Sequence, residues 1–307
     1  MVTSIHIISG FLGAGKTTFI KKLIPGFMGK TALIENEFGE VGVDGDLFEG
    51  ELAIREIQAG CICCSVVGDF QQAVTELMDS YQPNHIIIEP SGVAGLTDII
   101  RVCKMLIKKG KGNIRVENLV TIVDVTAFED YLENFGSFYR DQILNARTLF
   151  LSHLESCDEK EIKEVMAKLQ EINPRASISS EDWSKVDGET LRALVDTLGH
   201  PTLHMNNSVD IPTADQVFST LSIPKPKGIH NNCTEDFFRT LDQKHLGSIL
   251  RVKGILSLDT EEKIYVDYTP HHKHWEYIKK EKEEKLIFIG SGLEKKKIFE
   301  IFNRQEA

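Results

Sequence analysis

The sequence predicts an α/β fold in which a mostly parallel sheet is followed by a small C-terminal α+β domain. Apolar segments typical of strands alternate with helix-like segments over the first 200 residues, which is the order expected of a parallel sheet. These apolar segments are continuous and do not alternate with polar residues, which indicates strands covered by helices on both faces. A third observation is the length, because 307 residues correspond to about two domains at ~150 residues each.

The expected elements of the first domain follow the order β-α-β-β-α-β-α-β-β-α, with one further helix after them. Residues 35–50 hold four glycines and six acids, which favours a long loop, and residues 60–65 favour a turn. Strands are expected at 3–9, 30–34, 53–58, 85–89, 116–124 and 148–152, and helices at 16–24, 67–81, 95–109, 158–172 and 188–198.

The chain divides into three segments. Residues 1–200 form the expected α/β domain. Residues 201–233 are weakly periodic and rich in proline, asparagine and serine, which favours a linker. Residues 234–307 change character and predict the small α+β domain. Its expected elements are an initial helix, strands at 248–257, 263–268 and 285–290, and a helix at 293–303.

The composition excludes several classes of function. The chain has 35 basic and 46 acidic residues, so its formal net charge is −11, and it lacks the positive field that binds nucleic acids or anionic membranes. No apolar run approaches the ~18 residues that span a bilayer. The N-terminus has no basic region and no small-residue cleavage site, so we expect no signal peptide and a cytoplasmic protein.

A phosphate-binding loop is expected between the first strand and the first helix. Residues 10–17, Gly-Phe-Leu-Gly-Ala-Gly-Lys-Thr, match G-x-x-x-x-G-K-[ST] in its required strand–helix context. The glycines let main-chain N–H groups converge on phosphate oxygens. Lys16 reaches the β- and γ-phosphates, and the Thr17 hydroxyl ligates Mg²⁺. The candidate nucleotide ligands of this loop are Gly10, Gly13, Ala14, Gly15, Lys16, Thr17 and Thr18.

A second carboxylate completes the expected P-loop NTPase site. Glu89 ends the apolar strand 85–89 and precedes Pro90-Ser91-Gly92. The carboxyl ends of parallel strands face the ligand crevice, so we expect Glu89 to hold Mg²⁺ through water or to orient a hydrolytic water. The N–H group of Gly92 can donate to a γ-phosphate. The predicted catalytic residues are Lys16 and Glu89.

A cluster of three cysteines predicts a site for a thiophilic metal ion. Cys61, Cys63 and Cys64 form C-x-C-C, and three thiolates so close together are a soft ligand set that suits Zn²⁺, Co²⁺ or Ni²⁺. A redox role of the C-x-x-C pair before the helix is an alternative, as is burial as small apolar residues. A fourth ligand is available in the acidic loop, from Glu35, Glu37, Glu40 or Asp44.

Together these motifs make the sequence similar to the CobW family of metallochaperone GTPases, which belongs to the P-loop group of the nickel-insertion GTPases for urease and hydrogenase. The resemblance covers nearly the whole chain, and the C-x-C-C cluster is its most specific mark. The similar segments are residues 9–18, 34–44, 60–65, 89–92, 250–255 and 288–293.

The resemblance implies GTP binding, with GDP as product, and slow GTP hydrolysis coupled to the handling of a transition metal. It makes Glu35, Glu40 and Cys61 metal candidates, with Cys63 and Cys64 beside them. The switch loop that carries these acids is ordered by the γ-phosphate and Mg²⁺, so nucleotide state would change the metal site. The implied partner is a client metalloprotein or a corrinoid-pathway protein, and a homodimer across the nucleotide is compatible with the group.

One segment departs from the family pattern. Such GTPases read guanine with Asn-Lys-x-Asp after a late strand, and here Ser152, His153 and Glu155 stand for the Asn, the Lys and the Asp. Because base discrimination relies on satisfied polar pairs, this change leaves ATP, broad nucleotide use or weak binding as alternatives to GTP, and a non-hydrolysing nucleotide-gated module as an alternative to an enzyme. A redox regulator that uses Cys61 and Cys64 is a further alternative. The isolated His6 and His85 are interpreted as packed or exposed imidazoles.

Overall fold

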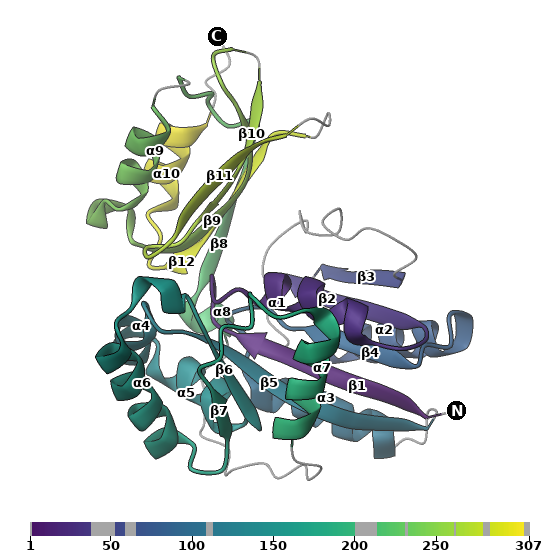
Figure 1. Cartoon of the computed structure of the whole chain (residues 1–307). Coiled ribbons are helices and arrows are strands. Elements are labelled where there is room, and N and C mark those ends of the chain that lie inside the picture. Colours follow the sequence, from purple (N-terminus) through teal and green to yellow (C-terminus); the bar gives the residue numbers. More distant parts are fainter. Residues whose placement is uncertain are drawn as a thin grey trace. The chain divides into compact units, whose positions relative to one another are not determined.

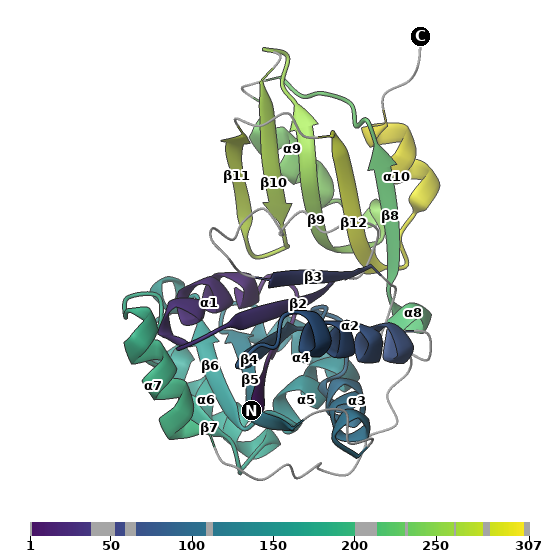
Figure 2. The same cartoon turned by 90° about the vertical axis from the view of Figure 1, so that its right-hand side faces the viewer.

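The computed structural model describes residues 2–37, 53–58, 66–108, 113–199, 214–230, 233–260, 262–278 and 283–303. Within these residues the chain forms two compact units, one before residue 200 and one from residue 214 onward. Each unit has its own sheet (Figure 1 and Figure 2). None of the helices in the described ranges is long and apolar enough to cross a lipid bilayer.

The first unit is built on a seven-stranded parallel sheet in the order β3-β2-β4-β1-β5-β6-β7. β1 lies in the middle of this sheet, between β4 and β5, so the carboxyl end of β1 is flanked by the ends of two other strands. The strands are β1 Thr3–Gly10, β2 Thr31–Glu37, β3 Ala53–Gln58, β4 His85–Glu89, β5 Ile114–Asp124, β6 Thr148–Ser152 and β7 Ser177–Ser179.

Helices cover both faces of this sheet. α1 and α7 pack together on one face, and α2, α3, α5 and α6 form a continuous layer on the other, as Figure 2 shows. The helices are α1 Lys16–Leu23, α2 Val66–Ser80, α3 Leu96–Lys108, α4 Phe128–Asn134, α5 Gly136–Leu144, α6 Glu159–Ile172 and α7 Gly188–Leu198, with 3-10 turns at Ile24–Gly26 and Leu154–Ser156.

The apolar core under α1 fixes the helix that carries the phosphate loop. Phe19, Ile20 and Leu23 of α1 are fully buried against strand residues such as Ile8 and Val120. Full burial of such a side chain stabilises the fold by about 1.5–3 kcal/mol. The start of α1 is therefore held firmly at the end of β1.

The second unit is an antiparallel sheet with two helices packed on one face. Its five strands follow the order β11-β10-β9-β12-β8, and Phe237, Phe238 and Ile298 of the helices pack on strand residues such as Val252 and Phe288. The elements are α8 Ala214–Val217, β8 Ser219–Pro224, α9 Thr234–Leu241, β9 Ser248–Ser257, β10 Lys263–Tyr268, β11 Lys273–Ile278, β12 Lys285–Ser291 and α10 Lys295–Phe302, with a 3-10 turn at Lys244–Leu246.

The predicted fold class is confirmed, and several elements differ from expectation. β2 continues to Glu37, so residues 35–37 are strand residues rather than loop residues. α4, α5, β7 and β11 were not predicted. β8 lies inside the stretch 201–233 that the sequence favours as a linker, and it pairs with β12. The three-segment division of the chain stays a prediction.

Candidate nucleotide and metal site

The phosphate loop connects β1 to α1 in a backbone conformation that requires glycine. Gly13 and Gly15 have φ angles of 78° and 92°, in the left-handed region, which side chains other than glycine rarely adopt. At Gly10 a Cβ atom would lie 2.6 Å from the carbonyl oxygen of Ile122, so the loop starts pressed against β5. The glycines of the motif are thus explained by backbone shape and close packing.

Lys16 occupies the position expected of a phosphate-binding lysine. Its side chain is 6% exposed, and its Nζ donates to the carbonyl oxygen of Phe11 at 3.1 Å, which keeps the ammonium group beside the loop. The first turn of α1 carries no acidic residue, so nothing there opposes the positive potential of the helix N-terminus. This end of α1 is suited to bind an anion.

Thr17 and Glu89 meet at the ends of two neighbouring elements. The Thr17 hydroxyl donates to Oε1 of Glu89 at 2.9 Å, which joins the first turn of α1 to the end of β4. A hydroxyl and a carboxylate are both oxygen donors of the kind that Mg²⁺ prefers. The residues present therefore fit a magnesium ion bound beside a phosphate.

Glu35 lies next to Glu89 in the sheet. The two residues are register partners on β2 and β4, and their exposed fractions are 5% and 9%. Two buried carboxylates on adjacent strands concentrate negative charge beside the phosphate loop, and a cation would offset it. Of the predicted ligands of the transition metal, Glu35 lies within the described ranges, and the candidate fourth ligand Glu37 is the last residue of β2. Glu40, Cys61, Cys63 and Cys64 lie outside the described residues.

The turn after β4 packs directly on the phosphate loop. A Cβ atom on Gly92 would lie 2.7 Å from Cδ2 and 2.8 Å from the backbone nitrogen of Leu12. The Gln142 side-chain amide donates to the carbonyl oxygens of Gly92 and Ala94 at 3.0 Å each. This anchoring places the Gly92 backbone beside the loop, as a γ-phosphate contact would require.

Two further candidates of the loop differ in exposure. Ala14 is fully buried, and its N–H donates to the carbonyl oxygen of Phe11 at 3.3 Å, which closes a turn within the loop. Thr18 is exposed in the first turn of α1, which leaves its hydroxyl accessible to a nucleotide.

The segment after β6 places its three predicted base-reading residues in different environments. Ser152 is buried, and its hydroxyl donates to the carbonyl oxygen of Val123 at 3.3 Å. His153 adopts a left-handed φ of 58°, and its Nε2 donates to the carbonyl oxygen of Gly13 at 3.3 Å. The Glu155 side chain is 70% exposed. Of these three residues, His153 is joined to the phosphate loop by this hydrogen bond to Gly13.

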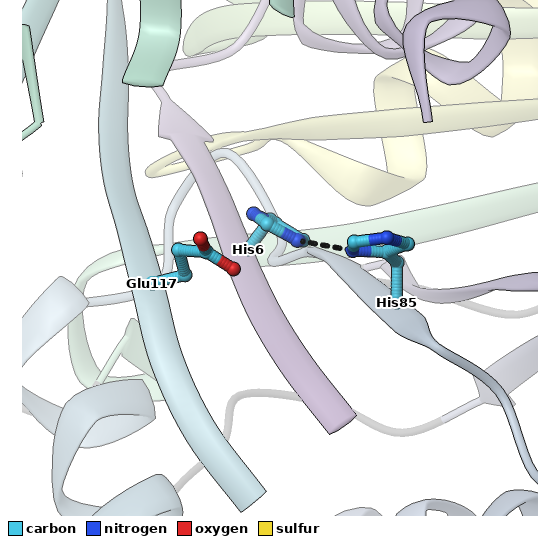
Figure 3. A group of neighbouring side chains, drawn as sticks. All are labelled: His6, His85 and Glu117. Atoms are coloured by element: carbon cyan, nitrogen blue, oxygen red, sulfur yellow. Dashed lines mark hydrogen bonds between the residues drawn. The ribbon is translucent and has the colours of Figure 1, made fainter. Parts of the chain in front are cut away.

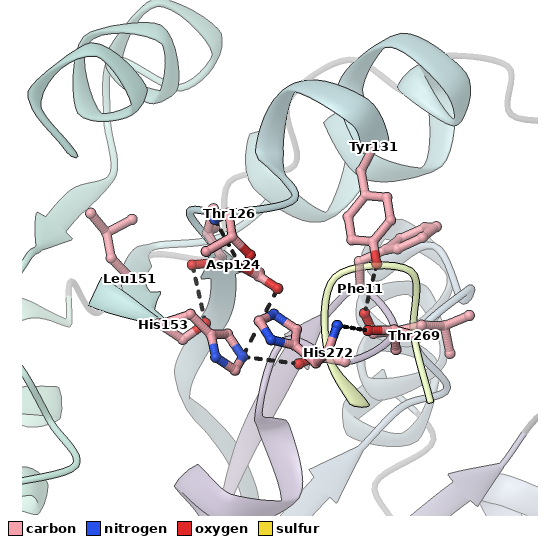
Figure 4. A network of polar contacts seen from close by, with 12 residues as sticks. Phe11, Asp124, Thr126, Tyr131, Leu151, His153, Thr269 and His272 are labelled. Atoms are coloured by element: carbon pink, nitrogen blue, oxygen red, sulfur yellow. Dashed lines mark hydrogen bonds and ion pairs between the residues drawn. The ribbon is translucent and has the colours of Figure 1, made fainter. Parts of the chain in front are cut away.

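Asp124 is a site residue that was not singled out from the sequence. It ends β5, is 1% exposed, and accepts hydrogen bonds from the N–H and hydroxyl groups of Thr126 at 2.9 and 2.6 Å. Its Oδ2 lies 3.9 Å from Nε2 of His153 (Figure 4). The signal was available, because Asp124 is a carboxylate that ends an apolar parallel strand, as Glu89 is.

Trp183 is a second residue that was not anticipated. Its indole N–H donates to the carbonyl oxygen of Leu151 at 2.9 Å, and its ring edge lies 3.7 Å from the position of a Cβ atom on Gly15. It also packs edge-on against Phe19. Trp183 therefore fills the space between β6 and the start of α1, and no local sequence pattern indicates this contact.

Comparisons with known families cover both parts of the chain. Residues 4–180 match the family described as CobW/HypB/UreG, nucleotide-binding domain. Residues 218–305 match the family described as cobalamin synthesis protein cobW C-terminal domain. The first match agrees with the position of the phosphate loop, and the second with the antiparallel sheet of the second unit.

Curated relatives are similar to this chain over part of their length. The zinc chaperone CobW of a Sinorhizobium species is 32% identical over 223 residues, which are 63% of this chain and 62% of the relative. The Escherichia coli zinc chaperone YjiA is 29% identical over 199 residues, which are 60% of this chain and 59% of the relative. The chain thus spans about three-fifths of the length of these relatives.

Two solved structures are among those similar to this chain. The Zn(II)-bound YjiA GTPase of Escherichia coli covers 98% of this chain and 98% of its own, with 19% identity and a TM-score of 0.49. HypB of Archaeoglobus fulgidus, a hydrogenase maturation factor, covers 64% of this chain and 90% of its own, with 20% identity and a TM-score of 0.41.

Proposed function

Since the chain belongs to the CobW/HypB/UreG family, we propose that it is a metal-handling P-loop GTPase that couples slow GTP hydrolysis to the transfer of a transition metal. The observation that carries this proposal is the contact between Thr17 and Glu89 at 2.9 Å, with Glu35 beside Glu89 on the next strand. A phosphate-binding helix, a magnesium-binding carboxylate and a candidate metal ligand therefore occupy one edge of the sheet.

Each residue of this edge has a defined task in the proposed reaction. Lys16 and the N–H groups of the loop bind the β- and γ-phosphates and neutralise charge that grows as the terminal phosphoryl group leaves. Thr17 and Glu89 would hold Mg²⁺, which would offset the negative charge of the phosphates. Glu89 would also orient the attacking water, and the backbone N–H of Gly92 would donate to the γ-phosphate.

The slow rate follows from the same residues. The described part of the phosphate loop and the elements around it offer Lys16 as the cation at the phosphates, and the loop itself contains no arginine. GTPases that lack an arginine finger turn over at about 10⁻³–10⁻⁴ s⁻¹. Slow hydrolysis would therefore set how long the protein stays in its GTP-bound state.

The proposed cargo is Zn²⁺, with Co²⁺ and Ni²⁺ as alternatives. Two relatives are named zinc chaperones, and thiolates with a carboxylate suit all three ions. Glu35, Glu40, Cys61, Cys63 and Cys64 would hold the ion. Because Glu35 adjoins Glu89, loss of the γ-phosphate and Mg²⁺ changes the charge beside the metal ligands. A client metalloprotein or corrinoid-pathway protein, a homodimer and a cytoplasmic location remain proposals of the same kind.

Turnover and metal content of the purified chain test this function. We expect Mg²⁺-dependent release of phosphate from GTP and at least one equivalent of bound zinc by elemental analysis. Glu89→Gln should abolish the release of phosphate and retain GTP binding. Glu35→Gln should lower zinc content and retain GTP hydrolysis. The same substitution at exposed Glu159 of α6 is the matched control. Phosphate release by Glu89→Gln at the wild-type rate would contradict the proposal.

A second candidate function is favoured by the segment after β6. The Ser152 hydroxyl already donates to the backbone of β5, and the Glu155 side chain is mostly exposed. Neither side chain is therefore held in position to read guanine. An ATP user or a nucleotide-gated module without turnover is compatible with this arrangement. Competition of GTP and ATP for the site, together with a phosphate-release assay in the presence of zinc, distinguishes these candidates. Phosphate release that stays at background with both nucleotides favours the non-hydrolysing module.

A further inference from the structure

Three metal-binding side chains meet in the first unit, away from the phosphate loop. His6 comes from β1, His85 from the start of β4, and Glu117 from β5, and Figure 3 shows the three side by side. One ligand atom from each lies within 4.8 Å of the other two. His6 is fully buried, His85 is half-buried, and the Glu117 side chain is 28% exposed. The group is therefore reachable from solvent on one side.

The two imidazoles point their nitrogens at each other. Nε2 of His6 lies 3.1 Å from Nδ1 of His85. Two nitrogens bound to one tetrahedral Zn²⁺, each ~2.0–2.1 Å from it, are about 3.3 Å apart. The two nitrogens are thus already near the spacing that one ion would impose. Because the folded sheet places them there, metal binding requires little rearrangement of the two side chains.

The proton shared by this pair is one that a metal ion can replace. The Asn118 amide nitrogen lies 3.1 Å from Nδ1 of His6. An amide nitrogen only donates, so this contact puts the proton of His6 on Nε2, from which it is donated to His85. Metal binding at Nε2 requires a half-turn of the Asn118 amide, which would offer its oxygen to Nδ1. This half-turn would break the hydrogen bond from the Asn118 amide nitrogen to Oδ1 of Asp196, at 3.3 Å.

The charges around the group are balanced. Arg115 lies 3.2 Å from Oε1 of Glu117, and Arg192 lies 3.9 Å from the same oxygen. Arg192 also pairs with Asp196 and stacks over Phe27, so its charge is partly offset. Arg115 is 63% exposed, and an exposed ion pair is worth about 0–1 kcal/mol. A cation can therefore displace it from Glu117 at small cost.

An aromatic ring shields the pair and links it to α1. The Phe27 ring lies 4.6 Å from the His6 ring and 4.7 Å from the His85 ring, centroid to centroid. Burial and the charge of Arg192 lower the pKa of both imidazoles, which keeps them in the neutral form that binds metals. Sites that hold an ion with three protein ligands leave the fourth position open for water.

We propose that His6, His85 and Glu117 form a second divalent transition-metal site, with Nε2 of His6, Nδ1 of His85 and a carboxylate oxygen of Glu117 as ligands and an open fourth position for water. His6 precedes Gly10 by four residues along β1, which is about 13 Å of strand. The site is thus separate from the phosphate loop. It shares no ligand with the cysteine cluster, so its failure would leave the proposed function intact.

Zinc titration of the full chain tests the site. The triple variant Cys61→Ser, Cys63→Ser and Cys64→Ser removes the proposed cargo ligands, and we expect it to retain one Zn²⁺ by isothermal titration calorimetry. Adding His85→Gln should weaken that binding at least tenfold, and adding Glu117→Gln at least threefold. His230→Gln is the matched control, because His230 is exposed and also pairs with a carboxylate, that of Asp259, at 2.7 Å. Its zinc affinity should stay unchanged.

A spectroscopic readout identifies the ligands without relying on affinity. In ¹⁵N spectra of the histidine rings, zinc should move the signals of His6 Nε2 and His85 Nδ1 and leave that of His230 in place. Glu117→Gln serves as the second variant where His85→Gln lowers stability, because Glu117 is partly exposed. The proposal is overturned if the triple variant binds no zinc, or if His85→Gln and His230→Gln lower its zinc affinity equally.

Discussion

The two ends of the proposed nucleotide site are built from different groups. At the phosphate end, backbone conformation and a buried lysine form the site: Gly13 and Gly15 have left-handed φ angles, and Lys16 is almost fully buried. At the base end, the site depends on side chains, of which Ser152 faces β5 and Glu155 is mostly exposed. Phosphate recognition by the main chain requires glycines at fixed positions and so tolerates few substitutions. Base recognition by side chains can be altered by replacing a single residue.

This difference has a consequence for specificity. Phosphates are common to all nucleotides, so in the proposed site the phosphate end would set whether a nucleotide binds and is hydrolysed. The base end would set which nucleotide is preferred. Substitutions at the phosphate end should thus affect GTP and ATP equally, and substitutions at the base end should change their ratio.

Lys16→Ala should have the largest effect. The variant loses charge-assisted hydrogen bonds to phosphate oxygens, each worth about 1.5–3 kcal/mol, so the affinities for GTP and ATP should both fall on the order of 100-fold. Fluorescence titration with labelled nucleotides measures this. Lys163→Ala on α6, where the side chain is 75% exposed, is the control. Unchanged binding in Lys16→Ala would mean that the loop does not hold phosphate.

Gly92→Ala should disturb the phosphate end through packing. The new Cβ atom would lie 2.8 Å from the backbone nitrogen of Leu12, and such overpacking costs about 1–3 kcal/mol of the free energy of unfolding. Urea denaturation measures the loss. Gly136→Ala is the control, because no atom lies within 4 Å of its Cβ position. Equal stability of the two variants would show that the turn after β4 can shift away from Leu12 without loss of stability, which would contradict the prediction.

Thr17→Ala should weaken nucleotide binding about tenfold, and only with Mg²⁺ present. The variant loses the hydroxyl that contacts Glu89 at 2.9 Å and would ligate the ion, which corresponds to about 1.4 kcal/mol. Thr17→Ser keeps the hydroxyl and should restore wild-type affinity. Nucleotide titrations with Mg²⁺ and with a chelator separate the loss of a magnesium ligand from a structural effect of the substitution. An equal loss under both conditions would argue for a structural role of Thr17.

Glu155→Ala should have the smallest effect. It should change the ratio of GTP affinity to ATP affinity. We expect the affinity for GTP to fall about fivefold, close to one net hydrogen bond, and that for ATP to stay constant. Glu159→Ala, a neighbouring exposed carboxylate, is the control. Competition titrations give the ratio. A constant ratio of GTP to ATP affinity would show that this segment does not read guanine and would favour a broad-specificity or ATP-using protein.

The sequence predicts those parts of the molecule that local patterns specify. The phosphate loop needs residues that are close together in the chain, and Glu89 follows from the rule that ligands bind at the carboxyl ends of parallel strands. α5 was not predicted, because it buries polar Asp141 and Gln142 beside aromatic residues, which obscures the helical period. β11 was not predicted, because it is an edge strand with exposed polar residues, as edge strands often are.

Contacts between distant residues account for the rest. His6 and His85 were interpreted as isolated imidazoles, and the pairing of β1 with β4 brings their nitrogens to 3.1 Å. Trp183 reaches the phosphate loop because β7 is paired with β6 at the edge of the sheet. Strand register and edge position depend on the whole fold, so no short segment of sequence indicates these neighbours.

The central claim is that nucleotide state changes metal affinity through the shared edge of Glu35 and Glu89. The most direct measurement is the affinity for Zn²⁺ of the full chain, determined with Mg²⁺ and either GDP or a non-hydrolysable GTP analogue. We predict that the two affinities differ at least fivefold, within the range of about 1–3 kcal/mol typical of coupled sites, and that Lys16→Ala removes the difference. Zinc affinities that agree within experimental error for both nucleotides would contradict the claim.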